Sequence, residues 1–119
     1  MKKKLNIAIQ MDPLENLNLK GDTTFALAME AQNRSFNLSH FTPNDVFYIS
    51  GKVLASTKKL NVFFKNGNEG FSYGKEQVED LSNFNIILMR QDPPFDLAYI
   101  TATHLLEKVS KKTLVINNP

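Results

Sequence analysis

The stretch from Asn85 to Asp96, which reads NIILMRQDPPFD, constrains the fold of this chain more than any other. Ile86 to Met89 is a short apolar run, typical of a strand that is buried on both faces of a sheet. Three polar residues, Arg90 to Asp92, follow directly. Pro93-Pro94 then prevents the strand from continuing, because proline has no backbone N–H to donate. The first proline also keeps Asp92 out of the α-helical region. We therefore expect a stiff turn that presents a guanidinium and a carboxylate.

In open α/β sheets, ligands bind at the carboxyl ends of the parallel strands. Arg90 follows such an end, and its planar fork of donors can bind a carboxylate with two parallel hydrogen bonds. An ion pair with Asp92 or Asp96 is the structural alternative. Asp92 either orients Arg90, binds a substrate amino group, or accepts hydrogen bonds from backbone N–H groups of its own turn. The pattern makes Arg90 and Asp92 candidate binding residues and leaves these alternatives open.

The rest of the chain alternates between strand and helix patterns, which predicts an α/β fold with a Rossmann-like, mainly parallel sheet flanked by helices and carrying an inserted antiparallel hairpin. The predicted strands are 5–11, 37–41, 59–64, 85–89 and 113–116, with a hairpin of 45–50 and 52–56 around Gly51, a short edge strand at 71–73 and a loop over 77–83. The predicted helices run from Asp22 to about Asn33 or Arg34 and from Leu97 to about Val109, the second capped by Asp96. The expected apolar stripe of the first helix contains Phe25, Ala28, Met29 and Gln32, widened by Leu27 and Ala31, and that of the second contains Tyr99, Ala102, Leu106 and Val109, widened by Ile100 and Leu105. Asn66-Gly67-Asn68 is a predicted turn.

Three further polar residues lie where a ligand could reach them. Asp12 ends the first strand, which we expect near the Ile86–Met89 strand, so Asp12 points to the same crevice; capping its own loop through Asn16 or backbone amides is the alternative. Lys20 and Asp22 lie at the start of the first helix, whose exposed N–H groups and dipole suit an anion. An ordinary N-cap is the alternative role of Asp22. No G-x-G-x-x-G follows the first strand, so dinucleotide binding is not predicted.

Composition excludes several classes of protein. With 119 residues, 42% of them hydrophobic, the chain is long enough for one domain with a core. Its net charge of +2 and the lack of a basic stripe argue against nucleic-acid binding. No apolar run approaches the ~18 residues of a membrane span, and residues 5–11, interrupted by Asn6 and Gln10, lack the continuous apolar region that is typical of a signal peptide. The chain has no cysteine, and His40 and His104 (the latter expected to be partly buried) lie on different elements, so no metal site is predicted. We expect a cytoplasmic protein.

The segment Met89-Arg-Gln-Asp-Pro-Pro-Phe-Asp96 resembles the MR-x-DPPFD signature of the bacterial glutathione synthetase family. The resemblance extends over almost the whole chain, through Met11-Asp-Pro13, Asn16, Asn18, Lys20 to Gln32, Leu60-Asn-Val62 and Val115 to Pro119. It corresponds to the first third of such an enzyme, the pre-ATP-grasp domain, with an ATP-grasp region following it. Gln91 and Asn118 depart from the usual pattern, which leaves fine substrate preference open.

This resemblance implies an enzyme that joins γ-L-glutamyl-L-cysteine to glycine through an acyl phosphate. Residues 1–119 would be a single substrate-binding domain, with Arg90, Asp92, Asp12, Lys20 and Asp22 helping to form the dipeptide site and no catalytic residue of its own. Mg²⁺ and ATP would be held by the ATP-grasp region, so we expect the isolated chain to be inactive. The family also implies a homo-oligomer when complete.

Two alternatives come from other functional classes. A phosphoacceptor receiver-like signalling domain has a similar scaffold, but it needs paired acids after the first strand, whereas Pro13 follows Asp12 here. Its acceptor position falls near Arg90, and Asn117-Asn118 replaces the required lysine. A stand-alone module that binds a small molecule or a protein in the same crevice is the second alternative.

Overall fold

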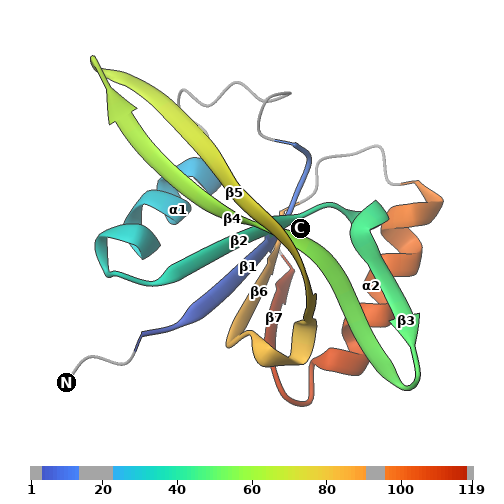
Figure 1. The fold of residues 1–119 in the computed structure, drawn as a ribbon. Helices are drawn as coiled ribbons and strands as arrows, with labels where there is room; N and C mark the ends of the chain where they lie inside the picture. The colour runs from blue at the N-terminus through green and yellow to red at the C-terminus, as the bar shows by residue number, and fades with distance from the viewer. Residues whose placement is uncertain (1–3, 14–22, 91–95, 118–119) are drawn as a thin grey trace.

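The computed structural model describes residues 4–13, 23–90 and 96–117. Figure 1 shows the order of elements in this part of the chain. They are β1 (Asn6–Gln10), α1 (Thr23–Asn33), β2 (Asn37–Phe41), the 3-10 turn η2 (Pro43–Asp45), β3 (Val46–Ile49), β4 (Lys52–Lys65), β5 (Asn68–Asp80), the 3-10 turn η3 (Leu81–Asn83), β6 (Ile86–Met89), α2 (Leu97–Val109) and β7 (Leu114–Asn117).

The strands form one mixed sheet in the order β3-β4-β2-β1-β6-β7, with β5 paired to β4. Its centre is parallel, because β1 pairs with both β2 and β6, and β6 pairs with β7. The inserted strands β3, β4 and β5 are antiparallel to their neighbours. This arrangement confirms the predicted fold class. It also confirms that the first strand lies beside the Ile86–Met89 strand.

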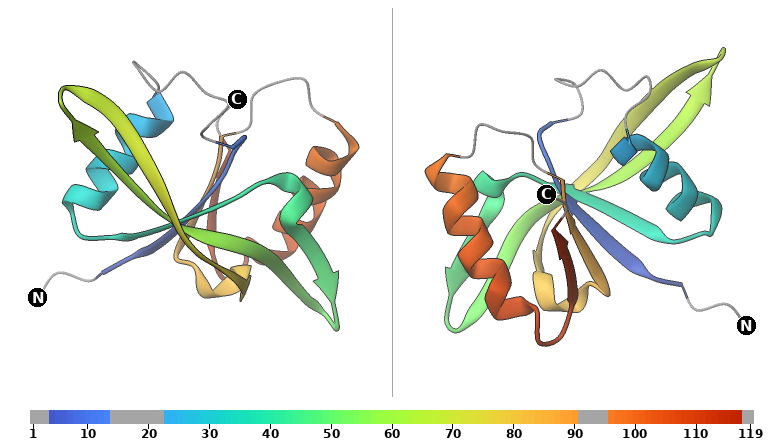
Figure 2. Two further views of the ribbon diagram at one scale, coloured as in Figure 1. Left: turned by 45° about the horizontal axis from the view of Figure 1, so that its top comes forward. Right: turned by 180° about the vertical axis from the view of Figure 1, so that it is seen from behind.

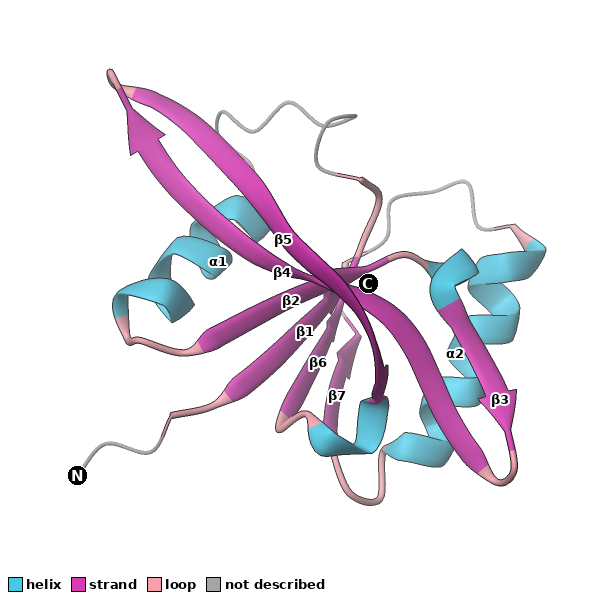
Figure 3. Ribbon diagram, viewed as in Figure 1, coloured by secondary structure: helices cyan, strands magenta, loops and turns pink. Residues whose placement is uncertain are grey.

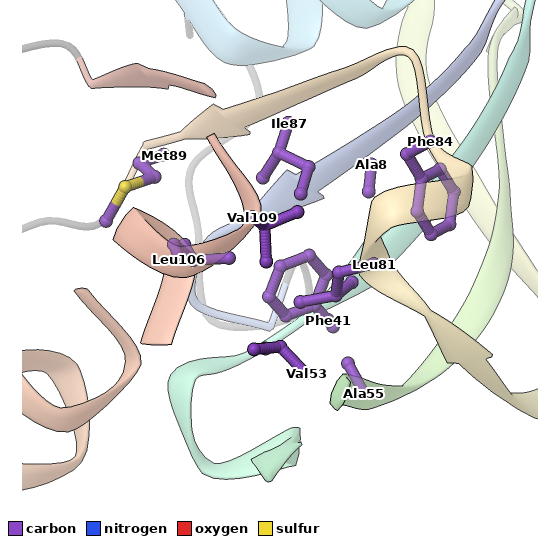
Figure 4. Close-up of a cluster of buried hydrophobic side chains, with 10 residues drawn as sticks. All are labelled: Ala8, Phe41, Val53, Ala55, Leu81, Phe84, Ile87, Met89, Leu106 and Val109. Carbon is purple, nitrogen blue, oxygen red and sulfur yellow. The ribbon is translucent and has the colours of Figure 1, made fainter. Parts of the chain in front are cut away.

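A hydrophobic cluster covers each face of the sheet, and the two helices lie on opposite sides of it (Figure 2). On the α1 side, Phe25 and Ala28 pack against Ile7, Ile9 and other residues of the sheet. The cluster on the α2 side, shown in Figure 4, contains Ala8, Phe41, Val53, Ala55, Leu81, Phe84, Ile87, Met89, Leu106 and Val109. Successive residues of a strand point to opposite faces, so each central strand contributes to both clusters.

Helix α2 begins as predicted, but its buried face is narrower. Its N-cap is Asp96, whose Oδ1 accepts a hydrogen bond from the Tyr99 backbone N–H at 2.9 Å. Ala102, Leu106 and Val109 of the expected stripe are buried, but Ile100, expected to widen it, is exposed. His104, expected to be partly buried, is also exposed. The apolar stripe is narrower than the sequence indicates, because the sheet under α2 contacts only one side of the helix.

Helix α1 ends at Asn33 as predicted and packs Phe25 and Ala28 into the core, but Leu27, predicted on its apolar face, is exposed. Gln32 connects this helix to β4. Its Nε2 donates to the carbonyl oxygen of Val62, and its Oε1 accepts from the Val62 N–H at 2.9 Å. Among the described pairings, β2 meets β4 only at Lys58 and Lys59. Gln32 therefore satisfies backbone groups of β4 where that strand has separated from β2.

The largest errors of the sequence prediction concern β4 and β5. The predicted strands 52–56 and 59–64 are one strand of 14 residues. Residues 71–73, predicted as a short edge strand, and the first part of the predicted loop 77–83 belong to a partner strand of 13 residues. Figure 3 shows the two as a long twisted ribbon that projects past α1. The predicted turns at Gly51 and Asn66-Gly67 are confirmed, with φ of 81°, 54° and 78°. No described helix has the length and apolar character needed to cross a membrane.

Candidate functional site

The carboxyl ends of β1 and β6 lie side by side at one edge of the sheet. Gln10 and Met89, the last residues of these strands, are register partners. The pairing continues one step further, because the Arg90 N–H donates to the Gln10 carbonyl oxygen at 2.8 Å. Arg90 and Asp12 therefore follow two neighbouring parallel strands at the same edge, which is where open α/β sheets bind ligands.

Arg90 is half-buried, and its side chain is held by the first turn of α1. The guanidinium donates from Nε to the hydroxyl oxygen of Thr24, 3.0 Å away. Thr24 is only 8% exposed, so the bond lies at the edge of the core and restricts the arginine. The two terminal nitrogens of the guanidinium take no part in this bond. They are the pair of donors that grips a carboxylate in bidentate fashion.

Asp12 lines a hollow of about 200 Å³ between the end of β1, the start of η2 and the start of α2. The polar lining includes Thr42, Asn44 and a second carboxylate, that of Asp96, which caps α2. Two carboxylates and an amide oxygen are acceptors, so this hollow suits a ligand that donates hydrogen bonds, such as an amino group. Arg90 and Asp12 thus offer opposite chemistry at adjacent strand ends.

The other predicted site residues, Asp92, Lys20 and Asp22, lie outside the described residues, as do Asn16 and the Pro93-Pro94 turn. Among the described residues, no three side chains of the types that bind metals gather in one place. A larger hollow of about 340 Å³ lies at the other edge of the sheet, lined by Asn6, Asn37 and Asp80 among others. That edge carries the amino ends of β1 and β2, so we base the candidate site on the Arg90 edge.

Thr24 is the residue of this site that sequence reasoning did not identify. It lies 66 positions before Arg90, and the signal available in the sequence, a hydroxyl in the first turn of a helix, also fits a structural role. His40, considered in the sequence only as a metal ligand, is buried next to this edge, with Nε2 3.1 Å from the Met11 carbonyl oxygen. Both residues depend on contacts between elements that are distant in sequence.

Comparison with known proteins identifies the family to which this chain is similar. Residues 5–119 match the family described as the prokaryotic glutathione synthetase N-terminal domain. A glutathione synthetase of Bradyrhizobium diazoefficiens is 49% identical over 116 residues, which are 98% of this chain and 37% of that protein. The glutathione synthetase of Agrobacterium fabrum is 45% identical over 119 residues, 100% of this chain and 37% of that protein.

The corresponding protein of Escherichia coli K12 is 42% identical over 116 residues, which are 97% of this chain and 36% of the relative. The chain thus spans little more than a third of the curated relatives that it matches. The match nevertheless covers nearly all of the chain itself, including the strands that carry Asp12 and Arg90. The chain belongs to the family of prokaryotic glutathione synthetase N-terminal domains.

Proposed function

We propose that this chain is the substrate-binding N-terminal part of an ATP-dependent ligase that joins γ-L-glutamyl-L-cysteine to glycine, acting in the cytoplasm as part of a homo-oligomer. The observation that carries the proposal is the place of Arg90: it follows β6 at the edge shared with β1 and is braced by Thr24. The family match supports this reading and not the receiver-like or stand-alone alternatives.

In the proposed reaction, the cysteinyl carboxylate attacks the γ-phosphorus of ATP, which forms an acyl phosphate and releases ADP. The glycine amine then attacks the acyl carbon, the new C–N bond forms, and phosphate leaves. We assign ATP and Mg²⁺ to an ATP-grasp region outside this chain. The described residues contain no cluster of three metal-binding side chains, so we derive no step of metal chemistry from them.

The part of this chain in the reaction is to bind and orient the dipeptide. Arg90 binds a carboxylate of the dipeptide through its terminal nitrogens, and Asp12 accepts hydrogen bonds from donor groups of the bound ligand. Asp92, Lys20 and Asp22 complete the proposed site. Holding the reacting carboxylate in one orientation lowers the entropic barrier of both steps, which is the contribution that a non-catalytic binding domain can make.

The first test uses the chain alone. Incubated with ATP, Mg²⁺, γ-glutamylcysteine and glycine, it should release no ADP, because the proposal places the nucleotide site elsewhere. The second test uses a chimera in which this chain replaces the matching first 37% of the Bradyrhizobium diazoefficiens relative. The chimera should form glutathione and ADP in equal amounts. Turnover by the chain alone, or a folded chimera that hydrolyses ATP without using the dipeptide, contradicts the proposal.

A further inference from the structure

A second hollow of about 200 Å³ lies beside the one that Asp12 lines. The two share Pro13 and Thr42, so they flank the same turn at the end of β1. The second hollow opens toward β2, β4 and β5. Besides the two shared residues, its lining consists of His40, Asp45, Ser56, Lys58, Tyr73 and Glu76. Its volume is several times the roughly 30 Å³ of one water molecule, so it can hold a small polar group.

The sheet itself brings these side chains together. His40 of β2 is the register partner of Lys58 of β4, and Lys58 is the partner of Glu76 of β5. Directly opposed residues of antiparallel strands point to the same face, so an imidazole, an ammonium and a carboxylate form a row across three strands. A register shift between Lys58 and Leu60 brings Tyr73 into line with this row.

The floor of the hollow is formed by the stacked rings of His40 and Tyr73. His40 is 5% exposed, its Nε2 lies 3.1 Å from the Met11 carbonyl oxygen, and its ring stacks on Tyr73 with centroids 5.4 Å apart. The Lys58 Nζ lies 5.3 Å from the centre of the same Tyr73 ring. A buried imidazole therefore fixes the tyrosine, and the tyrosine positions the ammonium group at the side of the hollow.

Charges of both signs face this small volume, since Lys58 and Glu76 are exposed at its rim above the aromatic floor. A ligand that carries only an anion would meet the Glu76 and Asp45 carboxylates, and one that carries only a cation would meet Lys58. A group that carries both charges on one carbon satisfies the two sides at once. That description fits the α-amino acid end of a molecule, where a carboxylate and an ammonium are bonded to the same carbon.

We propose that this hollow binds the free α-amino and α-carboxyl groups of the γ-glutamyl unit, with Lys58 on the carboxylate and Glu76 on the ammonium. The inference rests on the proposed function and adds the orientation of the dipeptide. In the strand order, β2 and β1 separate β4, which carries Lys58, from β6, which Arg90 follows. The two strands are therefore three spacings or about 14 Å apart, and the long lysine and arginine side chains shorten the gap that a ligand must span. A γ-glutamyl linkage runs through a side chain, so the dipeptide is as long as about three extended residues, roughly 10 Å. Arg90 then serves the cysteinyl end.

Substrate analogues test this assignment in the chimera. Aminobutyryl-cysteine lacks only the α-carboxylate of γ-glutamylcysteine, and glutaryl-cysteine lacks only the α-amino group. Lys58→Met should raise the KM for γ-glutamylcysteine about tenfold, the effect expected for one charged hydrogen bond, and leave the KM for aminobutyryl-cysteine unchanged. Glu76→Gln should raise the KM for γ-glutamylcysteine and leave that for glutaryl-cysteine unchanged. Lys65→Met and Glu107→Gln, at exposed positions away from the hollow, are the matched controls.

The outcomes separate the two proposals. An active chimera in which Lys58→Met and Glu76→Gln change the KM for all three substrates equally, or not at all, overturns the subsite and leaves the proposed function standing. A chimera without glutathione synthesis overturns the function, and the subsite is then decided on the chain alone by NMR. L-γ-Glutamyl-methylamide should shift the ring resonances of His40 and Tyr73, and Lys58→Met should abolish the shift. Unmoved ring resonances overturn the subsite.

Discussion

Arg90 and Thr24 are joined by a hydrogen bond of 3.0 Å from the guanidinium Nε to the threonine hydroxyl oxygen. The bond connects the carboxyl end of β6 to the first turn of α1, across the parallel pair of β1 and β6. An arginine side chain has several rotatable bonds, and a bond to a nearly buried partner reduces its freedom before a ligand arrives. The pair therefore presents the terminal nitrogens in a restricted orientation.

The first prediction concerns Arg90 itself. In the chimera, Arg90→Ala should raise the KM for γ-glutamylcysteine about 10- to 100-fold, because a charge-assisted bidentate pair contributes roughly 1.5–3 kcal/mol. The KM for ATP should stay nearly unchanged, because Arg90 is proposed to contact only the dipeptide. Arg90→Lys should recover part of the loss, since lysine retains the charge but not the planar fork. Steady-state kinetics with each substrate varied in turn measures these values, and equal increases for dipeptide and ATP would falsify a carboxylate clamp.

Thr24 should act by positioning Arg90. Thr24→Val preserves the shape and removes the acceptor, so we expect the KM for the dipeptide to rise several-fold while kcat stays near its original value. Thr24→Ser keeps the hydroxyl and should restore the KM. In the Arg90→Ala background, Thr24→Val should have no further effect on KM, because its partner is already missing. A full additional loss in that double variant would show that Thr24 affects binding through some other contact.

Gln10 is an unfavourable residue for stability. It is fully buried at the end of β1, and its amide nitrogen and oxygen have no hydrogen-bond partner among the described residues. An unsatisfied buried amide costs about 1–3 kcal/mol. Gln10→Met has a similar shape and no such cost, so urea unfolding of the chain should give a free energy of unfolding about 1 kcal/mol higher. A lower free energy of unfolding would mean that the amide is satisfied in solution.

Gln32 should have the opposite effect. Gln32→Met removes both hydrogen bonds to the Val62 backbone and leaves a donor and an acceptor of β4 unpaired. The free energy of unfolding should fall by about 1–3 kcal/mol. Asn33→Ala, at the exposed neighbouring position, is the control and should change it by less than about 0.5 kcal/mol. Comparable losses in the two variants would show that the effect does not come from the contact with the Val62 backbone.

Asp80 should make stability depend on pH. Hydrogen bonds from the Ser82 side chain and backbone N–H lower the pKa of the Asp80 carboxyl below its ordinary value. Because the carboxyl of the folded chain has the lower pKa, its stabilisation is complete above the ordinary value of about 3.9 and is lost as pH falls through the folded pKa. Asp80→Ala should lower the free energy of unfolding by about 1 kcal/mol at neutral pH, with a difference that shrinks below about pH 4.

Asp80→Asn provides the comparison for this effect, since asparagine retains an acceptor oxygen for the Ser82 N–H and loses only the titrating group. It should be more stable than Asp80→Ala at neutral pH, and the two should unfold with the same dependence on pH. Circular dichroism during urea titration at a series of pH values measures all three proteins. A constant gap between Asp80→Ala and the original chain down to strongly acid pH would exclude the carboxylate as the source.

The sequence by itself determined the features that depend on neighbouring residues. The order of strands and helices around the parallel centre, the Asp96 cap and the glycine turns follow from periodicity and local backbone chemistry. The position of Arg90 directly after a strand also follows from the sequence, because the apolar run stops at Met89 and the polar residues and two prolines that come next cannot continue a buried strand. Among the strand pairs that are distant in sequence, the sequence predicted only that β1 and β6 lie near each other.

The tertiary structure decided the length of the β4–β5 ribbon, the exposed sides of the helices and every contact of the candidate site. The residues of β5 alternate weakly and are mostly polar, so the pairing of this strand is set by its partner β4, whose alternate residues are buried, and not by a buried face of its own. Thr24 meets Arg90, and Glu76 comes to line one hollow with Lys58 and His40, only after the sheet has aligned segments that lie far apart in sequence. Such contacts depend on register and helix placement, which are properties of the whole folded chain.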